Sequence, residues 1–300
     1  MPTLYILDVR HGNSAVLIDD SGTIVIDAGP GSDLLDFLQE NNVNKIDILL
    51  LSHADQDHIG GAMSLLSSKE IEIKNVYLNT DSVKGSAIWN DLAYTLSDHH
   101  KRNKLHFEPS ITPHLNGKLD RGGITIEVLG PSGYLATKGP GSTDRKGRKL
   151  TSNSICAVFR LLYKNNPVVI FPSDIDDIGL DNLLGDCGDM KSWLAVFPHH
   201  GGNPGGGDVT IFTTKFCEAV KPNVIVFSIG HNQADFPNID VIKAIENALA
   251  SVQMYTTSSS GILLSHISDN KDSLHKDCVG TVWLDFDREP LEVVYEGMKL

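Results

Sequence analysis

Short apolar runs recur along the chain, and most are too brief for helices and rich in β-branched residues. They predict strands at 4–9, 14–19, 23–27, 46–52, 75–79, 124–130, 154–163, 167–174, 193–199, 224–231, 261–265 and 281–286. Helical spacing of apolar residues predicts helices at 32–42, 60–69, 86–100, 178–186, 211–220 and 238–250. The first strands are separated only by turn residues, whereas later strands alternate with helices. This order predicts an α/β fold of mixed sheets flanked by helices.

Length and charge limit the classes of protein to which this chain can belong. The chain has 300 residues, 41% of them hydrophobic, which is enough for a sizeable core. Because strand and helix patterns resume directly after each Gly-rich or charged loop, we expect one domain over 1–300. The formal net charge of −13 argues against a general nucleic-acid coat, but it leaves room for a local basic groove. The loop TKGPGSTDRKGRK (137–149) is either a solvated turn or a phosphate-facing wall.

Nothing in the sequence predicts a membrane association. No stretch approaches the roughly 20 apolar residues of a membrane span. The first residues, MPTLYILDVRHG, lack the charged and apolar regions of a secretory signal. Four widely spaced cysteines, Cys156, Cys187, Cys217 and Cys278, are typical of reduced thiols. We therefore expect a cytoplasmic protein with no membrane partner.

Several apolar strands end at an Asp or a His. These residues are Asp27, His53, Asp174, His199, His200 and His231. In sheets flanked by helices, ligands gather at one set of strand ends, so we expect these side chains to converge at one edge. Converging carboxylates repel one another unless a cation compensates them. A mixture of imidazole and carboxylate without thiolate suits Zn²⁺, Mn²⁺ or Fe²⁺.

The densest group of such residues lies in LSHADQDHIGG, after a buried strand and before a helix. We expect an extended segment that turns His53, Asp55 and Asp57 to one side, with His58 following as the helix begins. His53 and Asp55 could then bind one metal, Asp57 and His58 a second, and Asp174 could bridge them. Two metals about 3.5–4 Å apart can generate a hydroxide at neutral pH and clamp an oxyanion. An accidental acidic turn is the alternative, but it leaves the other strand ends unexplained.

HADQDHIGG resembles the signature of metallo-β-lactamase-fold hydrolases. Further segments resemble, in order, the soluble hydrolase domain of ComEC-type competence proteins: LDVRHGNSAVLI (7–18), TIVIDAG (23–29), SNSICAVFRL (152–161), FPSDID (171–176), FPHHGG (197–202), VIVFSIGHN (224–232) and YTTSSSGILLS (255–265). The resemblance implies an αββα sandwich with a dinuclear site at one edge, holding two divalent ions, Zn or Mn. It also implies phosphodiesterase or nuclease activity, which is typical of this subgroup.

The chain departs from the family pattern at three places. DVRHGN puts His11 and Asn13 near the site entrance. The superfamily's third His motif is missing, and Asn153 occupies that neighbourhood, so we place Asn153 beside the metals. Phe236 stands where a further ligating His is expected. His231, five residues earlier, is the expected substitute.

Each residue can be given an expected role. Asp57, His199 and His200 are the expected catalytic residues, and either histidine could contact phosphoryl oxygens or protonate the leaving group. Asp27 is expected to orient a ligating imidazole, with a turn-capping acid as the alternative. The expected metal ligands are His53, Asp55, Asp57, His58, Asp174 and His231.

These roles predict a metal-dependent hydrolase that cleaves a phosphodiester bond in DNA, RNA or a nucleotide. A hydroxide bound to two metals would attack phosphorus. Two alternatives remain open. One is a metallohydrolase of a lactone, thioester or lactam. The other is a non-catalytic binding or regulatory module whose metal site has decayed, which Phe236 and Asn153 support.

Overall fold

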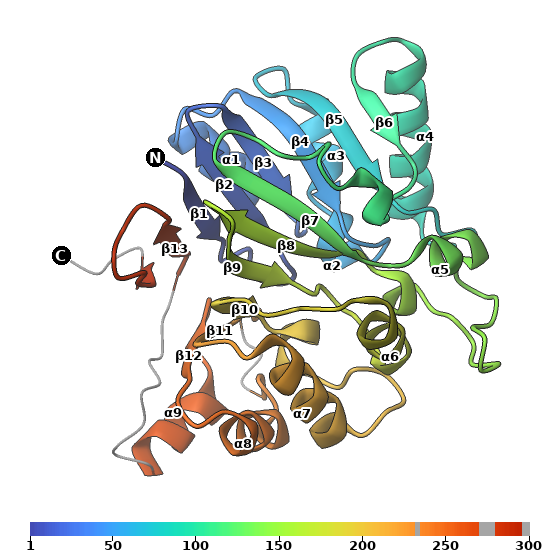
Figure 1. The fold of residues 1–300 in the computed structure, drawn as a ribbon. Helices are drawn as coiled ribbons and strands as arrows, with labels where there is room; N and C mark the ends of the chain where they lie inside the picture. Colours follow the sequence, from blue (N-terminus) through green and yellow to red (C-terminus); the bar gives the residue numbers. More distant parts are fainter. Residues whose placement is uncertain (232–234, 270–279, 296–300) are drawn as a thin grey trace.

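Two β-sheets pack face to face between layers of helices in the computed structural model, which describes residues 1–231, 235–269 and 280–295 (Figure 1). Among these residues, the larger sheet has the strand order β14-β13-β1-β2-β3-β4-β5-β6. Its strands are β1 (Thr3–Ile6), β2 (Ala15–Asp19), β3 (Gly22–Ile26), β4 (Lys45–Leu51), β5 (Glu72–Leu78), β6 (His106–Glu108), β13 (Val282–Asp285) and β14 (Val294–Tyr295).

The smaller sheet has the order β12-β11-β10-β9-β8-β7. Its strands are β7 (Ile124–Gly130), β8 (Val158–Tyr163), β9 (Asn166–Phe171), β10 (Leu194–Val196), β11 (Val224–Phe227) and β12 (Gln253–Thr256). Both sheets begin with antiparallel strands and continue with parallel ones. β3 to β6 run parallel in the first sheet, and β9 to β12 run parallel in the second. The predicted mixed sheets are therefore confirmed.

The apolar faces of the two sheets form the central core. Leu17 and Leu50 from one sheet and Phe159 and Val169 from the other belong to one buried cluster. Alternate residues of the same strands point outward, because successive side chains of a strand face opposite ways. These outward faces need a second apolar layer, which explains why the parallel strands read as nearly unbroken apolar runs.

Helices supply that second layer on each side (Figure 1). On the larger sheet, α1 (Asp33–Glu40), α3 (Ala62–Ser67) and α4 (Ala87–Lys101) bury Leu34, Leu65 and Leu92. On the smaller sheet, α6 (Asp177–Asp186), α7 (Val209–Val220) and α8 (Ile239–Ala248) bury Leu180 and Phe216. The remaining helices are α2 (Gln56–Ile59), α5 (Gly133–Lys138) and α9 (Gly261–Asp269). The αββα sandwich predicted from the sequence is thus confirmed.

The parallel strands bring their carboxyl ends to one edge of the sandwich, where the two sheets meet. Ser52 follows β4 in one sheet, and Ser173 follows β9 in the other. The Ser173 hydroxyl donates to Ser52 Oγ at 2.6 Å, and the Ala157 N–H donates to the Ser52 carbonyl at 2.9 Å. This junction places the strand-end Asp and His residues of both sheets side by side.

Five elements differ from the sequence prediction. Residues 261–265, expected as a strand, open helix α9, because Ser260 Oγ accepts a hydrogen bond from the Leu263 N–H and caps the helix. A run as short as GILLS does not distinguish strand from helix by periodicity. Strands β6, β12 and β14 and helix α5 were not predicted.

Two further sequence expectations concern cysteines and membrane spans. Cys156, Cys187 and Cys217 are free thiols, and Cys278 lies outside the described residues. Within the described ranges, no helix has the length and apolar character needed to cross a bilayer.

Candidate metal centre

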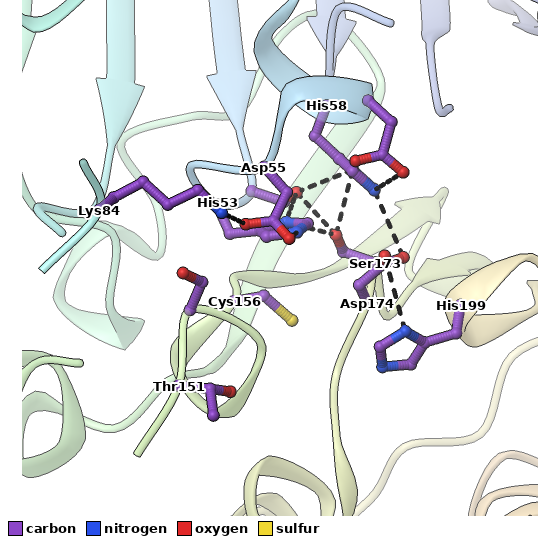
Figure 2. Close-up of polar contacts among 12 residues, drawn as sticks. His53, Asp55, His58, Lys84, Thr151, Cys156, Ser173, Asp174 and His199 are labelled. Carbon is purple, nitrogen blue, oxygen red and sulfur yellow. Dashed lines mark hydrogen bonds and ion pairs between the residues drawn. The ribbon is translucent and has the colours of Figure 1, made fainter. Parts of the chain in front are cut away.

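The HADQDH segment turns into a helix sooner than the sequence predicts. Helix α2 begins at Gln56, with Asp55 in extended conformation at its N-terminus. Asp57 and His58 are therefore adjacent helical residues, and the expected alternation over His53, Asp55 and Asp57 in an extended segment is wrong. The Asp55 side chain does not cap the helix. Its carboxylate instead accepts a hydrogen bond from Lys84 Nζ (Figure 2).

Four side chains converge on one point at the junction of the sheets. Asp57 and His58 come from α2, Asp174 follows β9, and His200 follows β10. One ligand atom of each lies within 4.8 Å of the others. His200 Nε2 is 3.2 Å from Asp57 Oδ2, and His58 Nε2 is 3.3 Å from Asp174 Oδ1. Donors bound tetrahedrally to one Zn²⁺ lie roughly 3.3 Å apart, so these two spacings fit a single ion, and the wider pairs of the group would have to draw together around it.

Each of these two imidazoles is held with Nε2 facing the group. His58 Nδ1 lies 2.7 Å from Asp27 Oδ2, and His200 Nδ1 lies 2.6 Å from the Ser228 carbonyl. A carboxylate or a carbonyl can only accept, so both Nδ1 atoms carry hydrogen. The Nε2 atoms can then offer a lone pair to a metal. Asp27 has the geometry of the orienting residue that the sequence predicted.

His53 is oriented by the two serines of the junction. The Ser52 hydroxyl donates to Asp27 Oδ2 at 2.9 Å, and the Ser173 hydroxyl donates to Ser52. Both oxygens can still accept, and they lie 3.1 and 3.3 Å from His53 Nδ1. His53 therefore also turns Nε2 toward the centre, where Asp55 Oδ2 is 3.9 Å away. Figure 2 shows the polar contacts around His53 and Ser173.

The backbone is strained where the two sheets meet. Asp27, Ser173, His199 and His200 all adopt left-handed conformations, with φ of 60°, 53°, 51° and 56°. Such conformations are uncommon for residues other than glycine and cost about 1–3 kcal/mol each. They cluster at functional sites because surrounding contacts must hold them there. Here the strain directs side chains from three strand ends toward one point.

Burial and neighbouring charges shift the pKa values of His58 and Asp174 in opposite directions. Burial alone would lower the pKa of His58, but Asp174 and Asp27 outweigh it and hold that pKa well above its ordinary value. Burial would raise the pKa of Asp174, but His58 and His200 hold it well below its ordinary value. Burial dominates at His199 and lowers the pKa of that imidazole. The centre is thus a compact set of opposite charges in a desolvated pocket.

The residues present fit a bound cation. Among the described residues, His53 Nε2, His58 Nε2, His199 Nε2 and Asp174 Oδ1 are buried without a hydrogen-bond partner. Buried polar atoms are rarely left unpaired, so this cluster requires an explanation. A divalent metal at the four converging residues supplies one for His58 Nε2 and Asp174 Oδ1, because unprotonated imidazole and carboxylate are its usual ligands.

Two sequence assignments are corrected by the geometry. His231, the expected substitute ligand, is not brought to the cluster, because its Nε2 lies 2.7 Å from Asp8 Oδ2 and 47% of its side chain is exposed. His200, expected as a catalytic residue, stands among the ligand atoms instead. Phe236 packs against Gly202, next to this turn. The fourth donor, His200, lies in the FPHHGG motif. Sequence spacing alone does not reveal which of the two histidines in this motif faces the cluster.

The remaining predicted residues lie around the cluster. His199 Nδ1 is 3.6 Å from Asp174 Oδ2, on the outer side of the four donors. Asn153 lies in a short 3₁₀ turn (Asn153–Ile155), and its carbonyl accepts from the Cys156 N–H. It lines a cleft of about 530 Å³ beside Asp55, together with Lys84 and Lys149. Lys84 was not singled out from the sequence.

Comparison with known proteins agrees with this fold. Residues 7–147 match the metallo-β-lactamase superfamily model. The structure is similar to the metallo-β-lactamase fold protein YhfI from Bacillus subtilis, at 11% identity over 87% of this chain and 98% of that one, with a TM-score of 0.54. The family model thus matches a little less than half of the chain, and the structure as a whole has a fold similar to that of YhfI.

More specific likenesses are local or weaker. ComE operon protein 3 of Bacillus subtilis (strain 168) is 34% identical over 73 residues, which are 21% of this chain and 9% of that protein. This match supports the resemblance to ComEC-type proteins over a short segment. A diphosphatase from the PhnP family aligns with 99% of this chain and 100% of its own, at 12% identity and a TM-score of 0.49.

Proposed function

We propose that the chain is a metal-dependent hydrolase of phosphodiester bonds in DNA, RNA or a nucleotide. The observation that carries the metal dependence is the convergence of Asp57, His58, Asp174 and His200 with unpaired buried donor atoms. A divalent ion such as Zn²⁺ or Mn²⁺ would supply Lewis acidity for activating water and polarising a phosphoryl oxygen. The phosphodiester specificity is supported by the resemblance to ComEC-type proteins.

Charge beside the centre also favours an anionic substrate. The protein is acidic overall, and the cleft next to Asp55 is lined by both signs of charge: Lys84, Arg148 and Lys149, with Asp176 and Asp177. Arg148 is engaged by Asp144 and Asp181 at 2.8 Å each. Lys149 is exposed on the cleft wall. A phosphate reaching the centre through this cleft meets the exposed ammonium of Lys149, which raises its local concentration.

His199 is the side chain best placed to contact substrate. It lies beside Asp174 but outside the group of four donors. Its Nε2 is buried and without a partner among the described residues, so it can hydrogen bond to a phosphoryl oxygen in the pocket. Because it comes from the same turn as His200, it is held at a fixed position relative to the donors.

Hydrolysis of bis(p-nitrophenyl) phosphate tests this proposal. The metal-stripped protein is assayed before and after adding Zn²⁺ or Mn²⁺, beside Asp57→Asn and the control His231→Gln. We expect metal-dependent turnover that Asp57→Asn loses and His231→Gln keeps. A lactone, a thioester and a lactam are assayed in parallel. Turnover of one of these without phosphodiester turnover would overturn the substrate class.

A further inference from the structure

Lys84 is held at the centre by contacts on its own backbone. It lies in the turn after β5, where Asp81 Oδ1 accepts from the N–H groups of Val83 and Lys84 at 3.1 and 3.0 Å. Asp81 Oδ2 accepts from the Ser152 hydroxyl at 2.5 Å. The turn is thereby fixed to the segment that precedes β8. From this anchored position the Lys84 side chain reaches Asp55 (Figure 2).

The two halves of the centre are unequal in their donors. Asp57, His58, Asp174 and His200 form a complete four-donor set. The Asp55 side has His53 and Asp55, with His199 lying across Asp174 rather than beside Asp55. Lys84 Nζ occupies one oxygen of the Asp55 carboxylate. Only 27% of the Lys84 side chain is exposed, so its ammonium is partly withdrawn from water.

An ammonium at Asp55 changes what that side can bind. It neutralises the carboxylate that would otherwise attract a cation. It also repels a second divalent ion placed close to the first, because like charges in a partly desolvated site disfavour each other strongly. The four-donor side is not affected in this way, since its two carboxylates face imidazoles.

We propose that Lys84 provides the positive charge on the Asp55 side of the centre, so that one divalent ion, bound by Asp57, His58, Asp174 and His200, saturates the protein. This departs from the two ions that the family resemblance implies. The inference depends on the metal centre but not on the substrate, so metal counts test it even if phosphodiesters are not hydrolysed.

The first test is metal stoichiometry. Stripped protein is titrated with Zn²⁺ by calorimetry, and bound metal is measured by mass spectrometry after desalting. We expect one ion per chain in the wild type, and a second ion that binds at least tenfold more tightly in Lys84→Met than in the wild type. Lys84→Arg keeps the charge and should keep one ion. Lys149→Met, a cation of the same cleft, is the matched control and should also keep one.

A second pair of variants locates the ion independently of Lys84. Asp55→Asn should retain the single tight ion, whereas Asp57→Asn should lose it. Thermal unfolding of each variant separates loss of metal from loss of fold. The proposal is overturned if the wild type binds two ions of similar affinity, if Lys84→Met leaves the second ion unchanged, or if Asp55→Asn abolishes the tight ion.

Discussion

His58 and Asp27 form a buried pair in which Nδ1 of the imidazole donates to the carboxylate at 2.7 Å. Asp27 also accepts from the Ser52 N–H at 2.7 Å. The carboxylate is thus fixed on one side, and it fixes the imidazole on the other. Because a metal requires a lone pair on Nε2 of His58, this pair sets whether the centre can form.

Asp27→Asn should weaken metal binding by about 10–100-fold, the usual effect of removing such a partner. The amide can still accept from Ser52, but its NH₂ group then faces His58 and favours the tautomer with hydrogen on Nε2. Calorimetric titration with Zn²⁺ measures the affinity. Asp47→Asn, which changes another buried carboxylate of the same sheet, is the control and should leave the affinity unchanged.

Replacing two histidines distinguishes the geometry from the sequence expectation. His200→Gln should lower metal content and reduce turnover at least a hundredfold, because His200 Nε2 is one of the four donors. His231→Gln should keep both, because His231 bonds Asp8. Bound metal per chain is the decisive measurement. The reverse pattern would restore His231 as a ligand.

Metal binding should strengthen as pH rises. In the metal-free protein the pKa of His58 is raised above its ordinary value, so its contribution to stability is present below about pH 6.5 and is lost as pH rises through the folded pKa. A metal must displace that proton, and it does so more easily at high pH.

The increase in melting temperature caused by Zn²⁺ should therefore grow between pH 6 and pH 9. Thermal unfolding with Zn²⁺ and with a chelator, at each pH, measures it. Asp174 affects the stability of the metal-free protein at the acidic end of the pH range. Its lowered pKa gives stability above about pH 4 that is lost as pH falls through the folded pKa. A metal-induced shift that is constant with pH would contradict the displacement of a proton.

The cleft cations should affect KM rather than kcat. Lys149→Gln should raise KM for an oligonucleotide several-fold at low salt, and the difference should vanish near 1 M salt, where the Debye length is about 3 Å. Lys146→Gln removes a charge from the same loop, but Lys146 lies 4.0 Å from Asp181. It should leave KM unchanged. Equal effects of the two variants would indicate a general charge effect instead of a contact in the cleft.

The packing between the sheets should dominate stability. Phe159 is fully buried in the central core, so Phe159→Ala should lower the free energy of unfolding by about 3–5 kcal/mol. Tyr94→Ala, at a side chain on the surface of α4, should change it by no more than about 0.5 kcal/mol. Denaturant unfolding at equilibrium measures both. A small change for Phe159→Ala would mean that the sheets repack.

The sequence predicted the parts of the site that follow from strand periodicity. Carboxyl ends of parallel strands meet at one edge, so the convergence of His58, Asp174 and the PHHG turn could be anticipated from where apolar runs stop. The same rule failed for His231. His231 lies four residues beyond the end of β11, and its Nε2 is 2.7 Å from Asp8 Oδ2 in the loop after β1.

Other features depend on local backbone and on distant contacts that spacing does not encode. His199 and His200 both adopt left-handed conformations, and His200 Nδ1 is held by the Ser228 carbonyl from the next strand end. Lys84 lies in the turn after β5, outside the motifs of the site. Only the folded chain brings its side chain to Asp55. Helix α9 was mistaken for a strand because its capping serine lies before an apolar run too short to show a period.

Because the centre lies at the junction of the two sheets, its metal occupancy depends on whether the sheets have docked. Asp57 and His58 belong to the end of one sheet, whereas Asp174 and His200 belong to the end of the other. Neither half of the chain holds more than two of the four donors, so a tight site exists only after the two sheets have docked. An ion bound there acts as a cross-link between the halves, and it stabilises the assembled state without stabilising either half alone. Metal loading therefore marks the molecules in which both sheets have come together correctly.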